Sequence, residues 1–263
     1  QLEVVGKSVD TPVFTMRDCK EPEKIALAAM KEAELKAQRK QKFAYNPIFS
    51  VVIPLYDTKP QYLRELIESI QAQTYTNWEL CLADGTGTDT PLKGIVEEYV
   101  KKDSRIKYEI LAENKGISEN TNAAIQMATG DFIVLADHDD IVPANTLFEC
   151  AKVVNEDITI DVIYSDEDKI DMSGKKYFDP HFKSDYNIDL LCSMNYICHL
   201  FVVKKDIIDK VGMLRNEFDG AQDHDFILRC CEVAQNIIGG VILIRLLQIQ
   251  RVNYMRLRQE EKR

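Results

Sequence analysis

The sequence lacks several patterns that assign a chain to a common class. No apolar run approaches the roughly 18 residues that a membrane-spanning helix needs. There is no Walker A loop, no G-x-G-x-x-G and no nucleophile elbow. Seven cysteines are an odd number without C-x-x-C spacing, which argues against a zinc site or a disulfide framework and fits a reducing, cytoplasmic location. The net charge of −10 lacks the basic footprint of a nucleic-acid binder, so we expect no nucleic-acid partner.

The two ends of the 263-residue chain differ from its middle. Residues 1–45 are rich in Ala, Glu and Lys, which predicts an N-terminal helical extension that packs on the main domain or mediates a homo-oligomer. Residues 241–263 form a basic segment, predicted to be a solvated helix or a peripheral contact with the inner face of an anionic membrane. Because the sequence begins at Gln1, we expect it to belong to a longer protein.

Residues 46–240 alternate short apolar runs with segments of helical periodicity. This alternation predicts one α/β domain with a mainly parallel, Rossmann-like sheet flanked by helices. The exception is the stretch 166–190, which is polar and aromatic without a clear period and is predicted to be a long loop region. The predicted strands are 49–55, 79–83, 106–111, 132–136, 161–165 and 199–203, and the predicted helices begin near 60, 91, 118, 143, 207 and 226.

Polar residues, most of them carboxylates, follow the predicted strands. In open α/β sheets, ligands bind in the crevice beyond the carboxyl ends of the strands. The sequence therefore predicts a ligand site on one rim of the sheet. The residues concerned are Tyr56 and Asp57, Asp84, Glu113 to Gly116, Asp137 to Asp140, and Asp166 to Asp168.

The acidic group at Asp137, Asp139 and Asp140 is the sharpest of these features. Three carboxylates packed behind an apolar strand repel one another and raise each other's pKa unless a cation lies between them. Carboxylate oxygens suit Mg²⁺ or Mn²⁺, which share such ligands with substrate phosphates. The alternative is an acidic turn that caps the next helix. Its position after a central strand favours the metal site.

Two further carboxylates have both a structural and a functional interpretation. Asp84 begins an Asp-Gly turn, and it is equally suited to accept hydrogen bonds from a nucleobase or ribose. Asp223 lies near the start of a predicted helix, where it acts either as a cap or as a general base for an acceptor hydroxyl. His224 is the rival base.

Taken together, five motifs resemble the family-2 glycosyltransferases of the GT-A fold. Each motif is weak alone, but their order and spacing over residues 46–236 are specific. The motifs are Val51-Val-Ile-Pro-Leu-Tyr56, Trp78-Glu-Leu-Cys-Leu-Ala-Asp-Gly85, Asn114-Lys-Gly116 with Asn120-Thr-Asn122, Gly130-Asp-Phe-Ile-Val-Leu-Ala-Asp137-His-Asp139-Asp140, and Gly220-Ala-Gln-Asp223-His-Asp225.

The resemblance implies an inverting enzyme that moves a sugar from a nucleoside-diphosphate sugar, with a UDP-sugar expected, to a saccharide or lipid-linked acceptor. Asp139 would hold Mg²⁺ or Mn²⁺, Asp137 would lie near the ribose, and Asp223 would be the base. Further implied donor residues are Pro54, Leu55, Tyr56, Asp84, Asn114, Gly116 and Asn122, and candidates for acceptor or supporting contacts are Asp140, Asp166, Asp168, His199, Gln222 and His224.

The sequence departs from the family pattern in two places. Ala83 stands where many members carry a first Asp before the glycine, and residues 237–263 contain no His, although members often complete the metal site there. Two alternatives therefore stay open. One is a nucleotidyltransferase, for which residues 53–60 lack a phosphate loop. The other is a catalytically inactive binding or assembly module.

Overall fold

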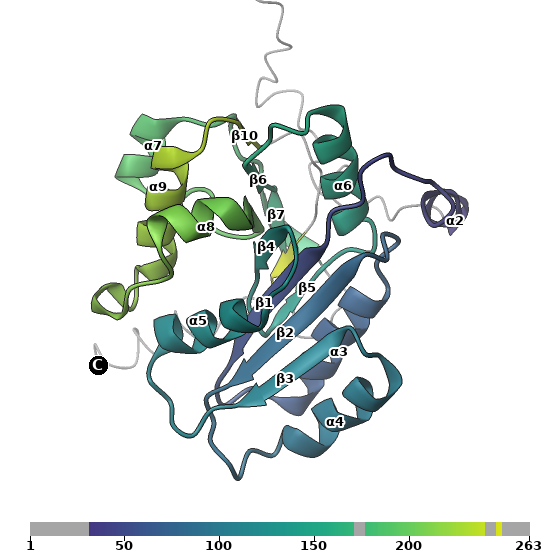
Figure 1. Cartoon of the computed structure of the whole chain (residues 1–263), viewed down its shortest axis with the longest axis vertical. Helices are drawn as coiled ribbons and strands as arrows, with labels where there is room; N and C mark the ends of the chain where they lie inside the picture. Colours follow the sequence, from purple (N-terminus) through teal and green to yellow (C-terminus); the bar gives the residue numbers. More distant parts are fainter. Residues whose placement is uncertain (1–31, 171–176, 240–245, 249–263) are drawn as a thin grey trace, which may run out of the picture.

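A seven-stranded sheet forms the centre of the molecule (Figure 1). The computed structural model describes residues 32–170, 177–239 and 246–248. Within the sheet, β9 runs antiparallel to both of its neighbours, and every other neighbouring pair is parallel. In spatial order the strands are β10 (Ile237–Ile238), β6 (Val162–Tyr164), β9 (Phe201–Lys204), β4 (Phe132–Leu135), β1 (Phe49–Leu55), β2 (Trp78–Asp84) and β3 (Ile106–Ile110).

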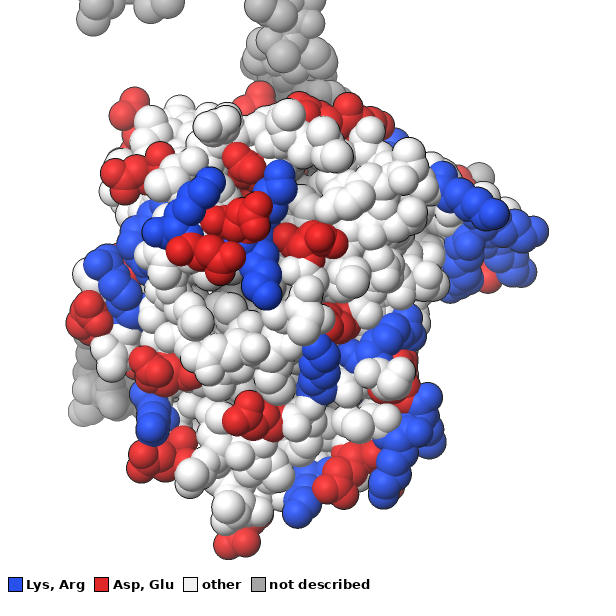
Figure 2. Space-filling model, viewed as in Figure 1, with Lys and Arg blue, Asp and Glu red and all other residues white. Residues whose placement is uncertain are grey.

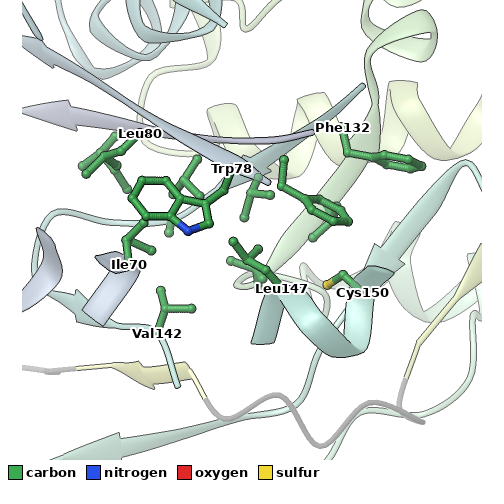
Figure 3. Packing of buried hydrophobic residues seen from close by; sticks show 14 of the residues in the cluster. Ile70, Trp78, Leu80, Phe132, Val142, Leu147 and Cys150 are labelled. Carbon is green, nitrogen blue, oxygen red and sulfur yellow. The ribbon is translucent and has the colours of Figure 1, made fainter. Parts of the chain in front are cut away.

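Helices bury both faces of this sheet. The side chains of β1 alternate between two apolar clusters, so every residue of this strand is buried. A strand covered on both faces reads as a continuous apolar run, as the sequence predicted for this segment. One cluster, part of which is seen in Figure 3, includes residues of α3 (Pro60–Gln71), α4 (Lys93–Lys102) and α6 (Thr146–Glu156), and the other includes residues of α5 (Ile117–Met127), α7 (Ile188–Ser193), α8 (Lys205–Val211) and α9 (Gln222–Val233).

Local sequence explains helix α3 well. Pro60 occupies the first turn, where its missing N–H has no helical partner to lose. Leu63, Leu66, Ile67 and Ile70 recur at helical spacing and are fully buried against the sheet. The helices predicted to begin near 60, 91, 118 and 143 are confirmed within a few residues.

A second, four-stranded sheet corrects the prediction of a loop over residues 166–190. Its strands, in spatial order, are β5 (Asp140–Ile141), β11 (Leu246–Gln248), β7 (Glu167–Ile170) and β8 (Tyr177–His181). Strand β7 buries Asp168 and Ile170 on one side, so a charged residue occupies an inward position. That carboxylate disrupts the apolar alternation by which a strand is recognised. Residues 246–248 of the predicted basic segment 241–263 form strand β11 of this sheet.

Residues 32–45 of the N-terminal extension are described, and they begin with helix α2 (Glu32–Gln38), which contacts the main domain. Gln38 donates from Nε2 to Glu149 at 3.3 Å and accepts from Thr74 Oγ1 at 2.8 Å. The rest of the predicted N-terminal helix and residues 249–263 lie outside the described residues, so the oligomer and membrane contacts stay predictions. On the face seen in Figure 2, Lys and Arg gather over α2 and elsewhere stand among Asp and Glu.

Among the described residues, no helix is both long and apolar enough to cross a lipid bilayer.

The carboxylate of Glu79 links β2 to β1 and to the segment before β4. It accepts hydrogen bonds from Ser50 Oγ at 2.7 Å and from the backbone N and Oγ1 of Thr129, and it pairs with Lys107 at 2.7 Å. Burial alone would raise the pKa of Glu79, but these donors together lower it to about 2. Because the folded-state pKa lies below the unfolded value, the stabilisation is complete above about pH 4.5 and is lost as the pH falls toward 2.

We therefore expect Glu79→Gln to lower the free energy of unfolding at pH 7 by about 3 kcal/mol, because the partly buried Lys107 loses its counter-charge. The substitution should also flatten the decline in stability on the acid side. Urea unfolding at pH 7, 5 and 4 measures both effects, with exposed Glu98→Gln on α4 as the control. A Glu79→Gln protein whose stability falls with pH as steeply as that of the unsubstituted protein would contradict this explanation.

Candidate functional site

The strand order creates a crevice beside β1. Strands β2 and β3 lie on one side of β1, whereas β4 lies on the other. Ligands of open α/β sheets bind where the strand order reverses in this way, beyond the carboxyl ends of the strands. Tyr56 follows β1 and Asp137 follows β4 at this point.

Two adjoining pockets open there. The first, of about 110 Å³, is lined by Asp137, His199, Gln222 and Asp223, which come from widely separated parts of the sequence. The second, of about 220 Å³, is lined by Tyr56, Asn114, Asn120 and His138, and both pockets share Pro54 and Ile117. Tyr56 is 54% exposed, which is unusual for a large aromatic ring. The crevice thus gathers many of the residues that the resemblance implied.

Strand pairing brings His199 to Asp137. In the antiparallel register of β4 and β9, Leu135 faces Phe201. Asp137 lies two residues after Leu135 and His199 lies two residues before Phe201, so the two side chains face each other. Their Oδ2 and Nε2 atoms lie 3.3 Å apart. Asp140 joins them because its Oδ2 accepts a hydrogen bond from the backbone N–H of Asp137 at 3.0 Å. Asp137, Asp140 and His199 each offer one ligand atom, and these atoms lie within 4.8 Å of one another.

Within this group, Asp137 and His199 stabilise each other's charged forms, whereas burial disfavours the charged form of Asp140. Asp140 is buried, which raises its pKa to about 8, and the nearby charge of Asp137 acts in the same direction. Burial alone would raise the pKa of Asp137, but the charge of His199 holds it below its usual value. Burial alone would lower the pKa of His199, yet Asp137 raises it well above 6.5.

Two buried polar atoms of the group lack a partner. Among the described residues, Asp140 Oδ1 and His199 Nδ1 are buried and have no hydrogen-bond partner. Such atoms usually coordinate or bond to something, because burying them unpaired costs about 1–3 kcal/mol each. Two carboxylates and an imidazole are a suitable ligand set for a divalent cation. Asp139, which the resemblance implied as the metal ligand, is not a member of this group.

Asp223 lies in the first turn of α9 and lines the first pocket. The helix begins after Ala221 and has no side-chain cap, so Asp223 does not cap it. Its Oδ2 accepts a hydrogen bond from Asn195 Nδ2 at 2.9 Å. The ring of the rival base His224 contacts the Leu191 carbonyl at 2.6 Å from Nε2, so that nitrogen carries a proton and donates it. Gln222 accepts from the backbone N–H of Gly220 at 2.7 Å.

Asp84 is fully buried and holds the turn that follows β2. Its carboxylate accepts from the backbone N–H of Thr86 at 2.9 Å, from Thr90 Oγ1 at 2.7 Å and from Tyr108 Oη at 2.8 Å. These three hydrogen bonds support the structural interpretation of Asp84. Its implied contact with a nucleobase stays a prediction.

The motif from Asn114 to Asn122 shapes the loop before α5 and the start of that helix. Asn114 Oδ1 accepts from the backbone of Gly116 at 3.1 Å and from Asn120 Nδ2 at 2.9 Å. Gly116 has a φ of 97°, and a Cβ there would collide with the carboxylate of Asp219. Asn122 exchanges two hydrogen bonds of 2.9 Å with the backbone of Leu214, so it lines neither pocket itself but holds a residue that lines the first.

Asp166 and Asp168 are buried at the second sheet and line neither of these pockets. Asp166 accepts from the backbone N–H of Lys183 at 2.8 Å. The side chain of Lys183 is fully buried, and its Nζ donates to the carbonyls of Ile197 and His199. Sequence reasoning missed Lys183, because a lysine in a polar stretch is expected to be exposed.

Three other residues at the site were also missed, namely Asn195, Asn120 and His138. Asn120 and His138 lie inside two of the five motifs, which was the only signal available for them. No sequence signal marks Asn195, which contacts Asp223 only through the fold.

Comparisons with known proteins assign the chain to a family. Residues 50–212 match the model of glycosyl transferase family 2, and the chain belongs to this family. It is 42% identical over 191 residues to the uncharacterized protein y4gI of Sinorhizobium fredii, an alignment covering 73% of this chain and 21% of that protein. It is 32% identical over 219 residues to the O-antigen biosynthesis protein RfbC of Myxococcus xanthus, covering 83% and 17%. The chain thus spans about a fifth of these relatives.

Two solved structures show the same GT-A fold. Residues 1–349 of TarS from S. aureus, in complex with UDP, superpose with a TM-score of 0.61 at 24% identity, over 73% of this chain and 57% of that one. The mannosyltransferase PcManGT from Pyrobaculum calidifontis, in complex with GDP-Man and Mn²⁺, gives a TM-score of 0.60 at 17% identity, over 87% and 66%. The chain is therefore a glycosyltransferase domain with the expected α/β architecture.

Proposed function

We propose that this domain transfers a sugar, with inversion, from a nucleoside-diphosphate sugar to a hydroxyl group of an acceptor. The observation that carries the proposal is the first pocket, in which Asp137 and His199 line the same cavity as Asp223. Residues suited to bind a divalent cation and a carboxylate suited to accept a proton therefore line the same pocket.

The donor's nucleotide fits the second pocket, where Tyr56, Asn114 and His138 combine an exposed ring with hydrogen-bonding groups. Aromatic rings bind bases by stacking, and amides supply directional hydrogen bonds. TarS in complex with UDP and PcManGT in complex with GDP-Man support a nucleotide in a fold of this kind. We propose UDP as the nucleotide, with the base between Tyr56 and Asn114.

Asp137, Asp140 and His199 are the proposed metal ligands. A bound divalent cation would neutralise negative charge on the leaving diphosphate. The imidazole favours Mn²⁺ over Mg²⁺, because Mg²⁺ prefers oxygen ligands throughout. Asp139, which is half-buried beside this group, is the alternative ligand that the family resemblance implies.

Asp223 is the proposed general base. One of its oxygens accepts from Asn195, and among the described residues its Oδ1 has no hydrogen-bond partner. Oδ1 would take the proton from the acceptor hydroxyl while the acceptor oxygen forms a bond to the anomeric carbon. The bond from that carbon to the diphosphate oxygen breaks on the opposite side, and the diphosphate leaves with the electron pair. This single displacement inverts the anomeric centre.

The acceptor is proposed to be a saccharide, free or linked to lipid, of a surface polysaccharide. The similarity to an O-antigen biosynthesis protein supports this substrate class. The chain spans only part of that relative, so the acceptor belongs to the proposal for the whole protein.

A melting-temperature screen tests the proposed function. UDP, GDP, CDP and dTDP are each added with Mn²⁺ and, separately, with EDTA. At a ligand concentration about 100 times Kd, binding adds about 2.7 kcal/mol, which corresponds to a rise of roughly 5–10 °C for a domain of this size. We expect one nucleotide, UDP, to produce this rise with Mn²⁺ and to lose it with EDTA. No response to any of the four nucleotides would refute the proposal.

Tyr56→Ala is expected to weaken binding of that nucleotide about 10-fold, because stacking of a base on an aromatic ring contributes about 1–3 kcal/mol. Isothermal titration with Mn²⁺ present measures the change in Kd. Ile158→Ala is the control, because Ile158 is 63% exposed and does not line either pocket. Equal Kd values for the two variants would remove Tyr56 from the nucleotide site.

A further inference from the structure

The side chain of Asn195 links Asp223 and Cys198, two residues that line the first pocket. Its Nδ2 donates to Asp223 Oδ2 at 2.9 Å, and its Oδ1 accepts from the backbone N–H of Cys198 at 3.1 Å. We propose that Asn195 is a positioning residue that sets the direction of the base Asp223. The inference rests on the proposed function, in which Asp223 takes the acceptor's proton.

The hydrogen bonds of Asn195 fix which way its amide points. An amide can be turned by 180° about its last bond, which exchanges its oxygen and nitrogen. The Cys198 backbone N–H can only donate, so the atom that faces it must be the oxygen of Asn195. The NH₂ group must therefore face Asp223, and the contact with Asp223 is a donor contact by necessity.

A donor in that place restrains the carboxylate of Asp223. The bond holds Oδ2 in one place, so that Oδ1 is the oxygen left for the acceptor. A catalytic group that is held in this way needs less reorganisation during the reaction.

The segment 195–199 extends this restraint to the metal-binding group. Asn195 at one end contacts Asp223, and His199 at the other end contacts Asp137. The buried Nζ of Lys183 donates to the carbonyls of Ile197 and His199, and these two hydrogen bonds anchor the segment. The separation between base and cation site is thus set by five consecutive residues held at both ends.

Packing of this segment does not depend on Asn195. Its neighbours Tyr196 and Ile197 are buried in the apolar cluster under α9, whereas the side chain of Asn195 is only half-buried and faces the pocket residue Asp223. Substitutions of Asn195 should therefore leave the fold intact, and their effects on turnover can be interpreted as effects on the site.

Asn195→Asp and Asn195→Ala separate positioning from a structural role. The Asp variant keeps an oxygen for the Cys198 N–H but places a negative charge against Asp223, whereas Ala removes both contacts. The assay is Mn²⁺-dependent hydrolysis of whichever of UDP-glucose, UDP-galactose, UDP-N-acetylglucosamine and GDP-mannose the full chain turns over fastest. We expect kcat to fall about 10-fold for Ala and further for Asp, with KM for the donor within twofold and Tm within about 2 °C.

A double-mutant cycle with Asp223→Asn completes the test. If Asn195 acts through Asp223, Asn195→Ala should have no further effect on kcat once Asp223 is Asn. Retention of wild-type kcat by Asn195→Asp, or an equal loss from Asn195→Ala in both backgrounds, would overturn the proposal. Retention of wild-type kcat by Asp223→Asn alone would instead refute the base assignment in the proposed function, and the positioning role with it.

Discussion

Replacing Asp223 by Asn is expected to lower kcat for sugar transfer about 1,000-fold while leaving the affinity for the nucleotide unchanged. The amide has nearly the shape of the carboxylate, but it cannot accept a proton at neutral pH. Asp223 lies with Gln222 on the α9 side of the first pocket, whereas the nucleotide is proposed to bind in the second pocket. The substitution should therefore lower kcat and leave the binding of the nucleotide unchanged. Quantifying the released nucleoside diphosphate gives kcat, and isothermal titration gives Kd.

The matched control for this prediction is Glu232→Gln, an exposed carboxylate on the same helix. It should retain full turnover and full affinity. A loss of nucleotide affinity in Asp223→Asn that equals its loss of turnover would make Asp223 a binding or structural residue and would leave the transfer without an identified base.

Asp140→Asn is expected to abolish the Mn²⁺-dependent rise in melting temperature without destabilising the protein in the absence of metal. A buried carboxylate with few partners costs stability when it ionises, and burial already raises its pKa to about 8. The amide removes that cost and retains an oxygen for the Asp137 N–H. Metal affinity should fall by a factor of 100 or more, because loss even of groups that only orient metal ligands costs 10–100-fold.

The Asp140→Asn protein is compared with the Asp139→Asn and Asp209→Asn proteins. The exposed Asp209 on α8 serves as the control for loss of a charge and should respond to Mn²⁺ as the unsubstituted protein does. A protein that keeps its Mn²⁺ response after Asp140→Asn but loses it after Asp139→Asn would assign the cation to Asp139, as the family resemblance implies, and would contradict the group of Asp137, Asp140 and His199.

Six strands of the central sheet, all except β10, were predictable from sequence because their signals are local. Runs such as Phe49–Leu55 are almost wholly apolar, since helices cover both faces of the sheet. Pro60 and four apolar residues at helical spacing indicate α3. Strand β7 was missed because it buries Asp168 where the pattern requires an apolar residue. Strand β11 was missed because its partners β5 and β7 are remote in sequence.

The candidate site was predictable only in part. Residues that directly follow a strand, such as Tyr56 and Asp137, could be placed on the rim because a parallel sheet fixes where its strands end. His199 precedes a strand, and it reaches Asp137 only because β9 runs antiparallel to β4 in one particular register. Neither the direction of β9 nor its register is encoded in the local sequence. The same holds for Asn195, whose contact with Asp223 spans 28 positions.

The position of the bound cation decides whether Asp137, Asp140 and His199 are its ligands. A crystal of the full chain grown with Mn²⁺ and UDP, measured for anomalous scattering, locates the metal independently of any assay. We expect one strong anomalous peak in the first pocket, within about 2.0–2.3 Å of oxygens of Asp137 and Asp140 and a ring nitrogen of His199, with the nucleotide's diphosphate beside it. A peak elsewhere in the chain, or UDP bound in the crevice without a metal at these residues, would contradict this assignment.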